Sequence, residues 1–360
     1  MKHYDVLVVG GGPAGSATPQ RLAAARARVV LVDKARFPRD KPCGGGLTMR
    51  AVRNCPVDPS PVVEEEVDLV ELRFRYGDSV VRRASAPVIW MTQRRRLDAF
   101  LLDAARDRGV EVREETTVDA TSFPADWVVA ADGANGTTAR AFGLAEGIVH
   151  GVAYEGNAPY GVVPRERYAR RALVELADIP GGYGWAFAKG DHVNVGVGAW
   201  QSEGTRIREH LKRVCEAHGL EAEKLEGLRG HRLPLRRPGV RIAGERTLCV
   251  GDAAGLIDPV SGDGMYECFV SARLATDAIL AGGLAGYQAA VEAELGALHR
   301  ASWKLKHALD RWPRASWRIA RTRLMWRSVE RLLLGELAAP GEQHGLARIP
   351  LRALDLLGRT

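Results

Sequence analysis

The fold is decided by residues 6–15, which read VLVVGGGPAG. The apolar run at the start has the length of a buried strand, and the glycines that follow it have the spacing Gly-x-Gly-x-x-Gly. A second apolar run, Val29–Val32, completes a strand–helix–strand pattern within about 30 residues. Glycines at these positions permit a tight turn and let a pyrophosphate approach the free N–H groups that begin a helix. The stretch therefore predicts a dinucleotide site, and a purely structural glycine turn is the alternative.

Asp33 indicates which dinucleotide is bound. It ends the second apolar run, at the position where a carboxylate can accept a hydrogen bond from a ribose 2′-OH. The same carboxylate would repel a 2′-phosphate, so FAD or NAD is favoured over NADP at this site.

A second motif lies far along the chain, where residues 248–255 read LCVGDAAG. A buried strand that ends at Asp252 suits hydrogen bonding to a polyol such as a ribityl chain. The glycines at 262 and 264 precede Met265, and a helix that begins there can offer N–H groups to the carbonyl edge of an isoalloxazine. A strand–turn–helix with incidental glycines is the alternative interpretation.

Further motifs connect these two: KPCGGG at residues 41–46, Arg94-x-x-Leu97-Asp98, ADG at 131–133 and YGWAF at 183–187. With them, the chain resembles the geranylgeranyl reductase family of FAD-dependent oxidoreductases, within the para-hydroxybenzoate hydroxylase-like flavoprotein superfamily. The resemblance covers residues 4 to about 280 and implies non-covalent FAD. One departure is Arg26, which stands where a glycine usually ends the first helix.

The resemblance and the order of the elements predict an α/β fold. We expect a discontinuous Rossmann-type FAD-binding domain, a mixed-sheet substrate domain and a C-terminal helical cap. Their expected ranges are 1–60, 95–145 and 236–282 for the FAD-binding domain, 61–94 and 146–235 for the substrate domain, and 283–360 for the helical region.

The resemblance also implies the cofactor contacts. Ala14, Asp33, Arg94 and the backbone of Val118 would bind the ADP half, Asp252 the ribityl or pyrophosphate, and the loop of Cys43 the flavin ring. The full expected set is Gly10, Gly12, Ala14, Gly15, Asp33, Cys43, Gly44, Gly46, Arg94, Val118, Asp252, Gly262, Gly264 and Met265.

Three residues are candidates for contact with the reacting atoms. Cys43, taken alone, is an ordinary loop thiol, but Lys41 and three glycines beside it make a lowered pKa conceivable, and the family places it next to the flavin. Tyr183 and Trp185 alternate with Phe187, so they share one face of a strand. That face is either core packing or an apolar wall for a substrate.

Composition and charge narrow the partners. Hydrophobic residues make up 46% of the 360 residues and charged residues 26%, which predicts a folded globular protein. The net charge of +7 is concentrated in residues 299–331, where ten Lys or Arg residues face two acidic ones, so no nucleic-acid groove is expected. This basic stretch carries four Trp residues and is either a helix packed on its own domain or a peripheral membrane contact.

Other chemistries are excluded by the absence of their motifs. The five Cys residues form no C-x-x-C pair, so no metal site is expected, and no G-x-S-x-G, Walker A or H-E-x-x-H motif occurs. No signal peptide and no long apolar run is present. A cytoplasmic location is expected, with or without peripheral attachment to a membrane.

The expected activity is reduction of C=C bonds in an isoprenoid or other apolar substrate, by hydride transfer from N5 of reduced flavin. The hydroxylases of the superfamily usually carry His where this chain has Gly255, which favours the reductase branch. NAD(P)H or ferredoxin would supply the electrons. The alternatives are a flavin-dependent monooxygenase, acting as a hydroxylase or epoxidase, and a flavin electron carrier to a membrane quinone.

Overall fold

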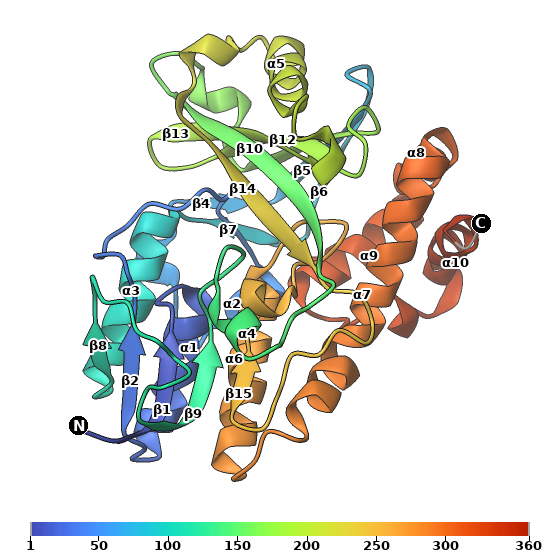
Figure 1. Cartoon of the computed structure of the whole chain (residues 1–360). Helices are drawn as coiled ribbons and strands as arrows, with labels where there is room; N and C mark the ends of the chain where they lie inside the picture. The colour runs from blue at the N-terminus through green and yellow to red at the C-terminus, as the bar shows by residue number, and fades with distance from the viewer. Residues whose placement is uncertain (1, 359–360) are drawn as a thin grey trace.

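The strand–helix–strand unit predicted from the glycine motif is present in the computed structural model, which describes residues 2–358. Strand β1 (Tyr4–Val9) leads into helix α1 (Pro13–Ala24), and β2 (Val29–Val32) returns parallel to β1 (Figure 1). They belong to a parallel sheet of order β15-β9-β1-β2-β8, completed by β8 (Glu111–Arg113), β9 (Ala125–Ala130) and β15 (Thr247–Cys249).

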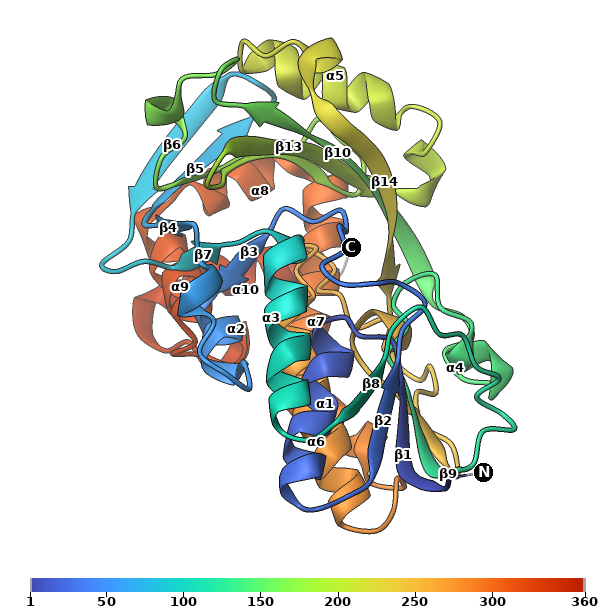
Figure 2. The ribbon, with the colours of Figure 1, turned by 90° about the vertical axis from the view of Figure 1, so that its left-hand side faces the viewer.

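Both faces of this sheet are covered, as the continuous Val and Leu runs of its strands require. Helices α1, α3 (Arg94–Asp107) and α6 (Met265–Leu280) lie together on one face (Figure 2). Val6 and Val8 point into the core beneath them, whereas Leu7 points to the other face and packs in a smaller cluster with Tyr4 and Val128. Short α4 (Thr138–Ala141) follows β9.

A seven-stranded mixed sheet arches over the carboxyl ends of the parallel strands (Figure 2). Its order is β14-β10-β13-β12-β11-β5-β6, and only the β11–β5 pair is parallel. Helix α5 (Ile207–Ala217) covers its outer side. The strands are β5 (Leu69–Phe74), β6 (Asp78–Arg83), β10 (Val149–Pro159), β11 (Arg171–Leu176), β12 (Tyr183–Ala188), β13 (His192–Trp200) and β14 (Glu226–Leu235).

A three-stranded sheet joins the two larger parts. Its order is β3-β7-β4, formed by β3 (Gly46–Thr48), β7 (Ile89–Met91) and β4 (Glu65–Val67). Helix α2 (Met49–Asn54) follows β3 directly. The boundary expected at residue 60 therefore separates strands that share one sheet. These results confirm the predicted α/β class with a Rossmann-type sheet, a mixed sheet and C-terminal helices.

The C-terminal helices pack against the rest of the chain. They are α7 (Tyr287–Arg311), α8 (Pro313–Ala320), α9 (Arg323–Leu334) and α10 (Arg348–Leu357). Three of the four Trp residues of the basic stretch, Trp303, Trp317 and Trp326, are buried, and only Trp312 is exposed, at 44%. Most Trp residues of 299–331 therefore belong to the core. Of these four Trp side chains, only that of Trp312 is exposed enough to take part in a membrane contact. No helix within residues 2–358 has the length and apolar composition needed to cross a bilayer.

Arg26 has the left-handed backbone conformation that the family's glycine would supply. It follows the end of α1 with φ +64°, a region that costs an L-residue about 1 kcal/mol or more relative to glycine. We expect Arg26→Gly to raise the free energy of unfolding by about 1 kcal/mol in urea denaturation followed by Trp fluorescence. Ala25→Gly, at φ −84°, is the matched control and should leave that free energy unchanged or lower it. A loss of stability in Arg26→Gly would contradict this assignment.

Candidate functional site

A cavity of about 570 Å³ lies between the parallel sheet, the inner face of the seven-stranded sheet, and helices α6 and α9. It brings together residues that are up to 323 positions apart in the sequence, from Gly10 to Leu333. Of the residues expected at the site, those that line the cavity are Gly10, Gly12, Ala14, Asp33, Cys43, Gly44, Gly46, Arg94, Tyr183, Trp185, Asp252, Gly262, Gly264 and Met265.

Gly15 and Val118 are not part of this lining. Gly15 packs beneath the turn, where an added Cβ would lie 1.8 Å from the carbonyl oxygen of Gly10. Val118 packs against the cluster that contains Tyr4 and Val30. Gly15 therefore supports the turn from below, and the side chain of Val118 belongs to the core.

The glycine turn leaves the start of α1 open to the cavity. Gly10 has φ +109°, and an added Cβ would lie 2.3 Å from the carbonyl oxygen of Ala131. Gly12 caps α1 without a side-chain hydrogen bond, and the first turn of the helix holds no acidic residue. Because the first N–H groups of a helix lack partners within it, this end is suited to bind an anion. The Asp33 carboxylate, at the end of β2, accepts hydrogen bonds from the N–H groups of Gly11 (2.7 Å) and Ala35 (2.8 Å).

A buried ion pair stands beside this turn. Arg94 donates from Nε and Nη2 to the two carboxylate oxygens of Asp98, at 2.6 and 2.8 Å. Burial by itself would lower the pKa of Arg94, but the charge of Asp98 more than offsets it and raises that pKa. Arg39 approaches the same carboxylate at 3.2 Å from the loop before Lys41. The pair thus fixes both α3 and residues 39–41 at the cavity.

Asp252 and Lys41 form a second pair at the end of β15. The Nζ of Lys41 donates to Oδ2 of Asp252 at 3.3 Å. Burial would raise the pKa of Asp252, but the nearby positive charges, first that of Lys41, lower it, so the carboxylate is ionised at neutral pH. His231 lies close by, and burial lowers its pKa to about 4, with a further lowering from Lys41. His231 is therefore neutral, and its buried Nε2 has no hydrogen-bond partner within residues 2–358.

The Cys43 loop is held by two charged residues that the sequence analysis did not identify. The N–H of Cys43 donates to Oε1 of Glu155 at 2.7 Å, and Nζ of Lys189 donates to the carbonyl oxygen of Cys43 at 3.0 Å. Both side chains are buried. Burial raises the pKa of Glu155 and lowers that of Lys189. The available signal was a charged residue within or directly after an apolar strand: Glu155 lies in β10, and Lys189 follows β12.

Gly45 explains why the loop needs its glycines. It has φ +81°, and an added Cβ would lie 2.2 Å from the carbonyl oxygen of Thr92 and 2.8 Å from Cε of Lys189. The backbone therefore passes closely between β7 and the end of β12.

The aromatic residues of β12 line the cavity on one side. The ring centroids of Tyr183 and Trp185 are 6.0 Å apart, and those of Trp185 and Phe187 are 6.3 Å apart. Trp185 Nε1 donates to Oδ1 of Asn194 at 2.8 Å, and the Tyr183 hydroxyl donates to the Ser261 carbonyl oxygen. Trp185 lies flat on β13 because Gly196 has no side chain there. The cavity continues along apolar side chains from other elements, namely Val70, Ile89, Ala172, Val174 and Leu333.

The residues present fit FAD, the cofactor expected from the sequence. The uncapped start of α1 suits a pyrophosphate, and the Asp33 and Asp252 carboxylates suit ribose and ribityl hydroxyls. Asp132 Oδ1, His231 Nε2 and Asp263 Oδ2 are buried at this cavity without hydrogen-bond partners in the described chain. A polar ligand would supply those partners, since buried polar groups are rarely left unpaired.

Comparison with known proteins gives consistent matches. The sequence pattern of the family described as pyridine nucleotide-disulphide oxidoreductase matches residues 4–158. The menaquinone reductase of Mycolicibacterium smegmatis is 32% identical over 326 residues, covering 79% of this chain and 78% of that protein. The chloroplastic geranylgeranyl diphosphate reductase of Oryza sativa subsp. japonica is 29% identical over 333 residues, covering 82% and 70%.

Among solved structures, a geranylgeranyl bacteriochlorophyll reductase-like protein from Thermoplasma acidophilum has the same fold. Its TM-score is 0.81 at 22% identity, and the match covers 98% of this chain and 100% of that one.

The cavity geometry predicts which thiols react. Cys43 is half-buried at the cavity, whereas Cys215, Cys249 and Cys268 are buried. Burial raises the pKa of Cys55 to about 11, so this half-buried thiol holds little thiolate at pH 8. In a short iodoacetamide pulse at about pH 8, read out by peptide mass spectrometry, we expect Cys43 to be modified first. Equal modification of Cys249 in the folded protein would contradict the structure, and a urea-unfolded sample, in which all five should react, is the control.

Proposed function

This chain belongs to the geranylgeranyl reductase family of FAD-dependent oxidoreductases, and we propose that it saturates C=C bonds of an isoprenoid or other apolar substrate. The observation that carries the proposal is that one and the same cavity has a polar part beside the glycine turn and an apolar part beneath β12. An elongated hydrocarbon suits the apolar part, since each buried CH₂ contributes about 0.8 kcal/mol without a directional partner. The prenyl substrates in the names of several relatives support the same class.

We place FAD along the cavity without a covalent bond. The ADP half would lie at Gly10, Gly12, Ala14 and Asp33, with Arg94 and the backbone of Val118 beside it, and Asp252 would bind the ribityl or pyrophosphate. The flavin ring would lie between the Cys43 loop and the start of α6. Support comes from the common location of the following residues on one cavity: Cys43, Gly44, Gly46, Gly262, Gly264 and Met265.

The reaction needs a hydride for one carbon of the double bond and a proton for the other. Reduced FAD, when bound, supplies the hydride from N5. Glu155 is the residue we assign to the proton: its carboxyl lines the cavity beside Cys43, and burial raises its pKa, which favours the acid form. Trp185 and Phe187 exclude water from the alkene and stabilise positive charge that develops on it.

The residues described above do not identify the electron donor. The sequence holds one Gly-x-Gly-x-x-Gly fingerprint of the strand–helix type, which we assign to FAD. We propose that NAD(P)H or ferredoxin binds transiently to reduce the flavin.

Removing the Asp252 carboxylate should weaken flavin binding. Asp252→Ala deletes a buried acceptor and leaves Lys41 without its partner, a loss of about 1–3 kcal/mol, or roughly 5- to 150-fold in Kd. Titration of apoprotein with FAD, followed by flavin fluorescence, measures the change. Asp103→Ala, which removes an exposed carboxylate paired with Arg106 on α3, is the matched control and should bind FAD normally. Unchanged affinity in Asp252→Ala would contradict the placement.

Glu155 should determine how turnover depends on pH. Because its pKa is raised, the acid form is complete at low pH and is lost as pH rises through that pKa, so wild-type turnover should fall on the alkaline side. Glu155→Gln keeps an acceptor for the Cys43 N–H but cannot release a proton. We expect it to retain FAD, to lose about 10²-fold or more in kcat, and to lose this pH dependence. Wild-type kcat and pH profile in this variant would exclude Glu155 as the proton donor.

The decisive test of the activity is product mass with and without O₂. Anaerobically reduced protein is incubated with geranylgeranyl diphosphate or a polyprenyl quinone, and the product is analysed by mass spectrometry. We expect a gain of about 2 Da per saturated bond and no requirement for O₂. A gain of one oxygen atom that depends on O₂ would establish the monooxygenase alternative. Reduction of a quinone head with an unchanged prenyl chain would establish the electron-carrier alternative.

A further inference from the structure

The most exposed large apolar side chains of the described residues lie together near the C-terminus. Leu346, Ile349 and Leu356 are 71%, 58% and 62% exposed, more than any other large hydrophobic residue within 2–358. Ile349 and Leu356 are seven positions apart in α10, so they lie on the same helix face. The opposite face, with Pro350 and Leu354, is buried. Such a stripe is unfavourable in water and indicates an interaction surface.

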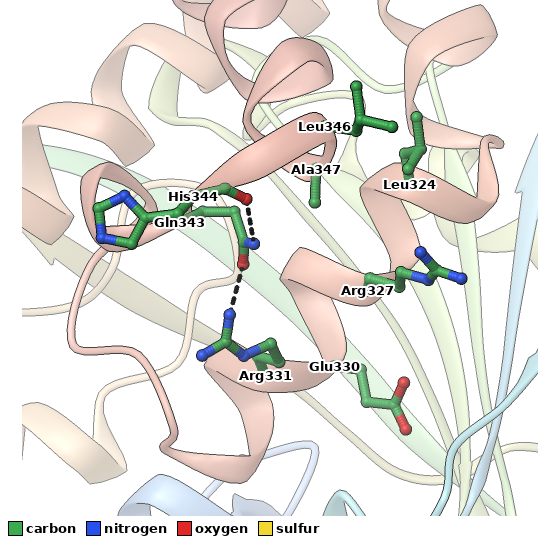
Figure 3. A pocket seen from close by; sticks show the side chains of 8 residues that line it. All are labelled: Leu324, Arg327, Glu330, Arg331, Gln343, His344, Leu346 and Ala347. Carbon is green, nitrogen blue, oxygen red and sulfur yellow. Dashed lines mark hydrogen bonds between the residues drawn. The ribbon is translucent and has the colours of Figure 1, made fainter.

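Unpaired cations border this stripe. Arg327, Arg348 and Arg352 are exposed and make no ion pair or hydrogen bond within the part of the chain that the structure describes. Figure 3 shows Arg327 on the same side as Leu324 and Leu346, at a surface pocket of about 460 Å³. Arg331, in contrast, turns to Gln343 and bonds with it at 3.1 Å.

The acidic residues of α9 and α10 are already engaged. Glu330 accepts hydrogen bonds from the N–H and hydroxyl of Ser85, and Asp355 pairs with Lys304 at 2.5 Å. The stripe therefore presents apolar side chains with an excess of positive charge, the combination that suits the headgroup region of an anionic bilayer.

We propose that this surface, formed by Arg327, Leu346, Arg348, Ile349, Arg352 and Leu356, docks the protein on an anionic lipid bilayer. The three apolar side chains enter the interface and the three guanidinium groups bind lipid phosphates. A second copy of the chain fits less well, because a symmetric pair would bring the same arginines face to face without acidic partners.

The docking surface includes a residue of α9, a helix that also contributes to the wall of the cavity. Leu333, on α9, lines the apolar part of the cavity, whereas Arg327 of the same helix belongs to the docking surface. Ser328 Oγ donates to the carbonyl oxygen of Ala347 at 3.2 Å and ties α9 to the segment before α10. Docking would place α9, which carries one wall residue of the apolar part of the cavity, next to the lipid. This connection rests on the proposed function, since it assumes a substrate that resides in a membrane.

Vesicle binding by the full-length flavoprotein tests the docking surface without measuring turnover. The wild type should co-sediment with vesicles of phosphatidylcholine and phosphatidylglycerol, and less so at high salt. Arg348→Gln with Arg352→Gln should weaken partitioning roughly 25-fold, and Ile349→Ser with Leu356→Ser at least tenfold. Leu280→Ser on α6 and Arg95→Gln on α3 change exposed residues elsewhere and are the matched controls.

Three results would overturn the proposal. The first is that the wild-type protein does not bind anionic vesicles. The second is that both double variants bind them as strongly as the wild type does. The third is that the protein forms a dimer without lipid, and that Ile349→Ser with Leu356→Ser converts this dimer to monomer. Turnover of a detergent-dispersed prenyl substrate is measured in parallel. The double variants should retain it, so that failure of docking is distinguished from failure of the proposed reaction.

Discussion

The structure depends on one loop that buried ionisable side chains hold from two sides. From the Rossmann side, Asp98 binds Arg39 and Asp252 binds Lys41; from the mixed sheet, Glu155 and Lys189 bind the backbone of Cys43. Each of these ionisable groups would be costly to bury without a hydrogen-bond partner, because burial removes its hydration. The loop is therefore fixed to both parts of the molecule, and the two parts are fixed to each other through it.

Because the loop is fixed to both sheets, the cavity has a polar part beside the parallel sheet and an apolar part beside the mixed sheet. The carboxyl ends of the parallel strands are the usual ligand-binding edge of an open α/β sheet, and here they supply the uncapped α1, Asp33 and Asp252. The mixed sheet supplies the aromatic face of β12, which glycines in β13 allow to lie close to the strand. A loop anchored to both sides lies between the polar and the apolar part of the cavity, as the proposed reaction of a flavin with a hydrocarbon requires.

Local patterns in the sequence predicted the first strands and helix of the Rossmann-type sheet, because the Val runs, the glycine turn and Asp33 are short-range signals. Glu155, Lys189, Arg39 and His231 were not identified, because their roles arise from contacts between distant segments, such as His231 opposite Ala153 and Arg39 against Asp98. For the same reason, the sequence did not decide whether the Trp residues of 299–331 pack on their own domain or contact a membrane. Periodicity indicates that they share a helix, but only the packing of Trp326 on Val70 and Val88 shows that it is buried.

The most direct test of the account is a single-turnover experiment without oxygen. The bound flavin is reduced anaerobically, mixed with a prenyl alkene in a stopped-flow instrument, and followed by its visible absorbance. If the alkene accepts the hydride in this cavity, the flavin reoxidises in the absence of O₂ with one bond saturated per flavin, and the rate falls as pH rises through the pKa of Glu155. A flavin that stays reduced with every prenyl alkene until O₂ is admitted would contradict the account.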